Sequence, residues 1–212
     1  MTPQIVDQVD HLVYATSEVD ATCAELEARL GVRASVGGQH IGRGTRNALI
    51  AIGGAGYLEI VGPDAAQPSP PAPRWFGIDS LTSPRLVAWA AHGSNLQRLA
   101  DDARHRGVDL GFVSNGRRTQ RDGVVLEWQV TDPSVVLESV VVPFFIDWGM
   151  SPHPSATSVA GPRLVDLRGE HPDPKRAREM LSAIGIEMPV TQATRPAIVA
   201  TFQSTLGLVE LR

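Results

Sequence analysis

The segment VDHLVYATSEVDATCAELEARLG, residues 9–31, decides the fold of this chain. Residues 9–15 have the apolar pattern of a buried strand, and a helical pattern follows from Asp20 to Leu30. Gly31 is placed to end that helix, since glycine readily adopts the left-handed conformation of a helix C-cap. The segment therefore predicts a strand followed by a helix.

The same strand and helix recur twice further along the chain. Helical patterns that end at Gly107 and Gly185 follow strand patterns around Leu86 and Leu164, at nearly the interval found in the first segment. A repeat of this kind indicates copied structural units. Of the three opening strands, only the first carries a histidine at the matched position, His11.

Each helix is followed by short apolar runs that predict further strands. In the first unit these include residues 47–52 and 57–61, which a tight turn at Gly53–Gly56 joins, after a glycine-rich bend at residues 37–44. Each unit then has the order β-α-β-β-β. The chain is accordingly predicted to belong to the α+β class.

The repeats divide the chain into three modules and two linkers. The predicted modules, of which the third is shortened, are residues 1–62, 85–148 and 163–212. Residues 63–84 and 149–162 are rich in proline, which interrupts regular structure, and are predicted to be linkers.

The composition excludes several classes of protein. The net charge of −4 is spread without basic runs, so nucleic acid is not an expected partner. No apolar run approaches the roughly 20 residues that span a bilayer, and the first residues lack the pattern of a secretion signal. We expect a cytoplasmic protein without a membrane partner, and the excess of arginine over lysine indicates a bacterial source. The single cysteine, Cys23, excludes an intramolecular disulfide and a cysteine-based metal site.

Four motifs carry a resemblance to a known family. They are DHLVYA at residues 10–15, GTRNAL at 44–49, YLEI at 57–60 and PFFIDWG at 143–149. Together with the βαβββ repeat they resemble the glyoxalase-like domain family of the vicinal oxygen chelate superfamily, which includes glyoxalase I, bleomycin resistance proteins and extradiol dioxygenases. The resemblance implies tandem modules that form a curled mixed sheet around a shared cup.

The resemblance also implies a metal site in that cup. Metal ligands in the superfamily come from the first and last strands of two paired modules, and His11 and Glu59 fit these positions in the first module. The second module has Leu86 at the first-strand position, which cannot bind a metal, whereas matching its last strand places Asp147 opposite Glu59. A set of His11, Glu59 and Asp147 suits Mn, Mg, Fe or Ni better than structural Zn, although Zn remains possible. No organic cofactor is expected.

Further residues are candidates for catalysis or substrate binding. Glu59 and His40 are candidate catalytic residues, and a solvated loop position is the alternative for the histidine. Thr45 and Asn47 could donate hydrogen bonds to a substrate, or could serve only the turn before their strand. Tyr57 and Trp148 could line the pocket or simply fill the core. His92 and His153 show no ligand spacing and are predicted to be surface or capping residues.

These observations support two functional hypotheses. The first is a metal-dependent enzyme of isomerase, lyase or dioxygenase type, acting on a small oxygenated metabolite whose oxyanion the metal stabilises. The alternative is a metal-free protein that binds or sequesters a small molecule in the same cup. Since βαβββ units tend to pair and the third module lacks an internal mate, a homodimer through residues 163–212 is also predicted.

Overall fold

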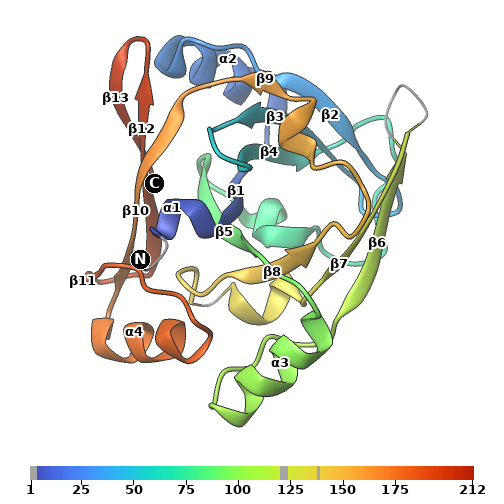
Figure 1. Cartoon of the computed structure of the whole chain (residues 1–212). Coiled ribbons are helices and arrows are strands. Elements are labelled where there is room, and N and C mark those ends of the chain that lie inside the picture. Colours follow the sequence, from blue (N-terminus) through green and yellow to red (C-terminus); the bar gives the residue numbers. More distant parts are fainter. Residues whose placement is uncertain (1–3, 120–123, 138) are drawn as a thin grey trace.

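The computed structural model describes residues 4–119, 124–137 and 139–212 (Figure 1). The first module follows the predicted order of one strand, one helix and three strands. After a short helix α1 (Ile5–Gln8), its elements are β1 (Val9–Ala15), α2 (Val19–Leu30), β2 (Ser35–His40), β3 (Thr45–Ala51) and β4 (Tyr57–Pro63). Gly31 ends α2 with a φ of 73°, as predicted, and its N–H donates to the carbonyl of Glu27.

The glycine-rich segment of the first module differs from its prediction as a bend. Residues 37–40 continue strand β2, and only the residues after His40 form the turn. The reason lies in the packing on this strand: a Cβ atom at Gly37 would collide with the side chain of Asn47, and one at Gly38 with that of Arg118. Glycine is used here to admit two polar side chains rather than to break the strand.

The second module repeats the order of the first. Its elements are β5 (Arg85–His92), α3 (Leu96–His105), β6 (Ser114–Thr119), β7 (Val125–Val130) and β8 (Phe144–Asp147). The two modules share one sheet in the order β2-β3-β4-β1-β5-β8-β7-β6, in which β1 and β5 are antiparallel neighbours at the centre. The sheet curls strongly (Figure 1). As a result, Arg118 on β6 donates a hydrogen bond to Asn47 on β3. The predicted curled mixed sheet is confirmed.

The third module forms a sheet of its own. Its elements are β10 (Arg163–His171), α4 (Pro174–Ala183), β11 (Val190–Gln192), β12 (Ala197–Ser204) and β13 (Gly207–Leu211), and the strand order is β11-β10-β12-β13. This sheet stands beside the curled sheet (Figure 1). The backbone N–H of Leu86 on β5 donates to the carbonyl of Arg212.

One apolar core extends through all three modules. Leu12, Trp89 and Phe202, one from each module, are fully buried in the same hydrophobic cluster. Burial of this kind is the main stabilising contribution to a fold of this size. Among the described residues, no helix is long and apolar enough to cross a membrane.

Both predicted linkers contain short ordered elements that pack on the curled sheet. Residues 63–84 include the 3-10 helix η1 (Trp75–Ser80), whose Phe76 is buried. Residues 149–162 include η3 (Pro154–Ala156) and β9 (Val159–Ala160), and β9 pairs with β3. A further 3-10 helix, η2 (Pro133–Val136), precedes β8. The linkers thereby bring Trp75 and His153 close to the strands that carry the predicted site.

Candidate active site

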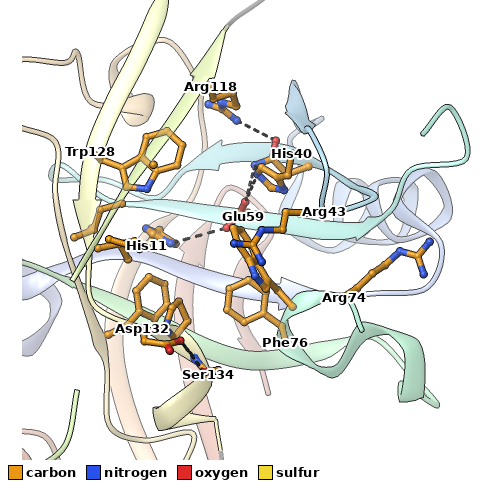
Figure 2. Close-up of a pocket in the computed structure, with 18 of the residues that line it drawn as sticks. His11, His40, Arg43, Glu59, Arg74, Phe76, Arg118, Trp128, Asp132 and Ser134 are labelled. Atoms are coloured by element: carbon orange, nitrogen blue, oxygen red, sulfur yellow. Dashed lines mark hydrogen bonds and ion pairs between the residues drawn. The ribbon is translucent and has the colours of Figure 1, made fainter. Parts of the chain in front are cut away.

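A cavity of about 670 Å³ lies within the curl of the first two modules. Strands β1, β3 and β4 contribute polar residues to it, and β7 and β8 contribute mainly apolar ones (Figure 2). Its size is within the range of small-molecule sites in proteins. The predicted residues that line it are His11, His40, Asn47, Tyr57, Glu59 and Trp148.

Glu59 is the carboxylate at the centre of this cavity. It is 8% exposed, and its Oε1 accepts a hydrogen bond of 2.6 Å from the Nδ2 group of Asn47. His11 Nε2 lies 3.9 Å from Oε2, and His40 Nε2 lies 3.7 Å from Oε1 (Figure 2). His11 and Glu59 meet because β1 and β4 are parallel neighbours and both residues face the inside of the curl.

The ring of His11 is held in one orientation. Its Nδ1 lies 2.7 Å from the Oδ1 atom of Asp10, and the ring stacks on Tyr57 with centroids 4.7 Å apart. A carboxylate can only accept, so Nδ1 carries a proton, and Nε2 is the ring nitrogen that faces Glu59. The same arrangement is found behind many histidines that bind metals or transfer protons.

Asp10 is the centre of a second polar cluster, on the far side of His11 from Glu59. Its Oδ2 lies 2.9 Å from His92 Nδ1 and 3.1 Å from His153 Nε2, and it accepts a 3.1 Å hydrogen bond from Trp148 Nε1. Burial by itself would raise the pKa of Asp10, but the bonds from His11, His153 and His92 outweigh burial and hold that pKa far below its usual range. Asp10 therefore stays ionised.

Sequence reasoning missed this second cluster. An aspartate in an otherwise apolar strand was the available signal, but its partners come from β5 and from a predicted linker. His153 does cap η3, as predicted, because its Nδ1 accepts the backbone N–H of Ser155. His92 and His153 were expected only as surface or capping residues, yet both contact a fully buried carboxylate.

The two clusters differ in what they offer to a metal ion. Within the described residues, the group that brings three potential ligand atoms within 4.8 Å of one another is Asp10, His92 and His153. His153 Nδ1 accepts an N–H, so its proton is on Nε2 and points at Asp10, which favours a hydrogen-bonded cluster there. Around Glu59, in contrast, the Nε2 atoms of His11 and His40 lie 3.9 and 3.7 Å from the carboxylate, and these three groups would fit a divalent ion.

The structure corrects the predicted position of Asp147. Its neighbours Phe144, Ile146 and Trp148 line the cavity, so alternation along β8 turns Asp147 away from it. The carboxylate accepts the backbone N–H of Gly149 instead. Asp147 is thus not brought together with the first-module ligands, and the three-residue set expected from the resemblance is not assembled.

His40 lies at the end of β2 and is only 13% exposed, in contrast to the solvated loop position considered for it. Its Nδ1 is 2.9 Å from the hydroxyl of Thr45, and the amide of Asn47 is 3.3 Å from its Nε2. Burial lowers the pKa of His40, Glu59 opposes this effect, and Arg118 and Arg43 add to it. Thr45, which is buried, supports His40 rather than lining the cavity.

Of the four arginines that line the cavity, Arg117 pairs with Glu127 at 3.9 Å, and the other three differ in their partners (Figure 2). Arg74 forms an ion pair of 2.6 Å with Asp79. The guanidinium of Arg43 lies 4.2 Å over the ring of Trp75, and Arg118 donates to Asn47 at 3.2 Å. No sequence pattern singles out Arg118 as a site residue, and it reaches the site only because the sheet curls.

Comparison with known proteins agrees with this architecture. A model of the glyoxalase-like domain family matches residues 9–185, whereas no curated protein matches the sequence. A hypothetical protein from Staphylococcus aureus is similar in structure over 95% of this chain and 97% of its own, with a TM-score of 0.65 and 10% identity.

Methylmalonyl-CoA epimerases are more distant in structure. Those of Mycobacterium tuberculosis and Streptomyces coelicolor have TM-scores of 0.44 and 0.43 and identities of 16% and 19%. They cover 74% and 66% of this chain, and 96% and 94% of their own chains. At these scores the epimerases do not inform the assignment of the site. The match over residues 9–185, with the curled sheet of paired βαβββ modules, shows that the chain belongs to the glyoxalase-like domain family of the vicinal oxygen chelate superfamily.

Proposed function

We infer that the cavity is the active site of an enzyme that removes a proton from a carbon atom next to a carbonyl group in a small oxygenated metabolite. The observation that carries this inference is the placement of Glu59. One of its oxygens is held by Asn47, and the other faces His11 without a hydrogen bond. A buried carboxylate with a free oxygen in a cavity is the arrangement a general base requires.

The residues around Glu59 have separate roles in the proposed reaction. Glu59 takes the proton from the carbon, and the electron pair of the broken C–H bond moves toward the carbonyl oxygen. His11 exchanges the proton through Nε2, because ionised Asp10 stabilises its ring when it becomes charged. Aromatic groups, including Trp75 and Phe144, keep water away from the reacting carbon.

A divalent ion belongs to this proposal as well. His11 and Glu59, with His40 in place of Asp147, are the residues that would hold it, and His11 Nε2 would then bind the ion instead of exchanging the proton. When bound, the ion would supply a Lewis acid for the oxygen that becomes negatively charged. Metal content of the purified protein and of His11→Ala, measured by inductively coupled plasma mass spectrometry, tests this part: about one equivalent in the first and little in the second is expected. Equal content in both would remove His11 as a ligand.

Proton removal is tested by hydrogen exchange. Small 2-oxo and 3-oxo carboxylic acids and their esters are incubated with the protein in D₂O, and loss of the α-proton signal is followed by NMR. We expect accelerated exchange for at least one compound, and a loss of about 10²- to 10⁴-fold in Glu59→Gln. Exchange that survives this substitution would rule out Glu59 as the base.

The alternative, a binding or sequestering protein, is favoured by the aromatic wall of the cavity. Trp75, Phe76, Trp128 and Phe144 all line it. In that case His11→Ala would leave ligand affinity nearly intact, whereas truncation of Tyr57 or Trp148 would reduce it. Isothermal titration calorimetry on these variants separates the two functions.

A further inference from the structure

Arg118 is a buried cation to which the described residues offer no acidic partner. It is 9% exposed, and in the described part of the chain its side chain donates one hydrogen bond, to the neutral Oδ1 atom of Asn47. A buried charge is costly unless an opposite charge compensates it. The guanidinium lines the cavity, so a ligand in the cavity can supply that opposite charge.

The surrounding strands are built to hold Arg118 in place. Its stem crosses Gly38, where a Cβ atom would come within 2.9 Å of the Arg118 Cδ. The backbone N–H of Gly38 donates to Asn47 Oδ1 at 2.8 Å, which fixes the amide so that this oxygen receives the guanidinium. Arg118 from the second module is thus positioned by two strands of the first.

The Asn47 side chain connects Arg118 directly to Glu59. The amide oxygen accepts from Arg118, and the amide nitrogen donates to Glu59 at 2.6 Å. A group bound at Arg118 therefore lies one amide away from the proposed base. The separation of Arg118 and Glu59 by the one side-chain amide of Asn47 suits a substrate whose anionic group is next to its reacting carbon.

A second cation strengthens the argument for an anionic ligand. Arg43 rests on the ring of Trp75, and the described residues offer it no acidic partner. Both Arg118 and Arg43 lower the pKa of His40, so both act on the same part of the cavity. Arg74 differs, because Asp79 already neutralises it.

We propose that this cavity binds substrates that carry a carboxylate group, which Arg118 recognises through its planar guanidinium while Glu59 acts on the neighbouring carbon. The forked donors of arginine match the two oxygens of a carboxylate. A monoanion suits the single buried guanidinium, whereas a phosphate dianion would place excess negative charge beside Glu59. This inference rests on the proposed function for the role of Glu59, but not for the binding of the carboxylate.

Benzoylformate is a suitable probe, since it carries a carboxylate next to a ketone and has no α-proton to exchange. Its binding is measured by isothermal titration calorimetry and compared with that of its neutral methyl ester and of inorganic phosphate. We expect the acid to bind at least tenfold more tightly than the ester and than phosphate. Equal binding of acid and ester, or tighter binding of phosphate, would overturn the proposal.

Variants assign the effect to Arg118. Arg118→Met should weaken benzoylformate binding by about 10- to 100-fold, and Arg118→Lys should retain part of the affinity because it keeps the charge without the fork. Arg98→Met, on the exposed surface of α3, is the matched control and should bind as the unmodified protein does. Unchanged affinity in Arg118→Met would refute the assignment.

Two further variants keep the result interpretable. Gly38→Ala displaces the Arg118 side chain without removing its charge and should also weaken binding, which covers the case in which Arg118→Met does not fold. Glu59→Gln should retain benzoylformate binding. If exchange activity survives in Glu59→Gln while benzoylformate binding still depends on Arg118, the proposed function fails and the carboxylate site stands. If binding is unaltered in both Arg118→Lys and Gly38→Ala, the carboxylate site is refuted and the proposed function is not affected.

Discussion

Two buried carboxylates flank the ring of His11, and their surroundings differ. Asp10, which is fully buried, is contacted by nitrogen atoms of His11, His92 and His153 and by the indole of Trp148. Among the described residues, Glu59 receives one hydrogen bond, from Asn47, and otherwise faces the Nε2 atoms of His11 and His40 at 3.9 and 3.7 Å. A carboxylate whose oxygens all have hydrogen-bond partners stabilises the fold and orients its neighbours. A carboxylate in a cavity with one oxygen left without a partner is free to react.

Replacing each carboxylate by its amide should give the largest difference between Glu59 and Asp10. Glu59→Gln is expected to lose about 10²- to 10⁴-fold in exchange activity, because the base is gone. Its free energy of unfolding should stay within about 0.5 kcal/mol of the original, since only one hydrogen bond to Glu59 depends on the charge. Urea unfolding followed by circular dichroism measures the second quantity, and a large loss of stability would show that Glu59 is structural.

Asp10→Asn should show the opposite balance. The amide leaves part of the donors around Asp10 without an acceptor, and each such buried group costs about 1–3 kcal/mol of unfolding free energy. Activity should fall less than in Glu59→Gln, by about 10- to 100-fold, because the orientation of His11 is disturbed while the base remains.

Asp147→Asn is the matched control for Asp10→Asn. It changes a half-buried carboxylate on β8 that accepts a backbone N–H and lies outside the cavity, and it should alter neither quantity by a measurable amount. A stability loss in Asp147→Asn as large as in Asp10→Asn would mean that the Asp10 cluster has no special role.

The pH dependence of the free energy of unfolding gives a smaller effect of Asp10. The pKa of Asp10 is held far below its ordinary value near 3.8, so unfolding in acid is accompanied by proton uptake at this group. Its contribution is complete above the unfolded pKa and declines as the pH falls below it, with a slope of up to about 1.4 kcal/mol per pH unit. Urea unfolding between pH 5 and pH 3 should show a steeper loss for the unmodified protein than for Asp10→Asn. Parallel curves would contradict the assignment of this slope to Asp10.

Loss of the predicted homodimer should affect the site least, because the third module does not line the cavity. Leu206 and Leu208, beside or within β13, are 65% and 69% exposed at the edge of the third sheet. Light scattering after size-exclusion chromatography should give twice the monomer mass, and Leu208→Glu should give the monomer. A monomeric unmodified protein would end this prediction.

The fold could be predicted because its signals are local. Strand alternation, helical spacing and glycine C-caps recur in each module, and Gly31 adopts the expected left-handed conformation. The pairing of His11 with Glu59 is implied by the family resemblance, and in the structure the two residues meet through one parallel strand pair, β1 with β4. These features depend on residues close in sequence or on a single strand pairing.

The rest of the site could not be predicted, because it depends on long-range packing. Asp147 was misplaced since matching motifs between modules does not fix which face of β8 enters the cavity. Asp10 meets His153 across 143 residues, and Arg118 meets Asn47 across 71. No periodic pattern in the sequence links residues this far apart. The linker brings His153 to Asp10, and the curl of the sheet brings Arg118 to Asn47.

The glycine at position 38 has a consequence for how such a cavity can change. The side chain of Arg118 occupies the space that any other residue at position 38 would fill. A substitution at Gly38, on β2 at one edge of the curled sheet, would therefore displace the side chain of Arg118, on β6 at the other edge. The ligand preference would change although the residue at position 118 stays the same. In relatives of this chain, the residues at positions 38 and 118 should vary together. A side chain at position 38 should mark a relative that binds neutral rather than charged ligands.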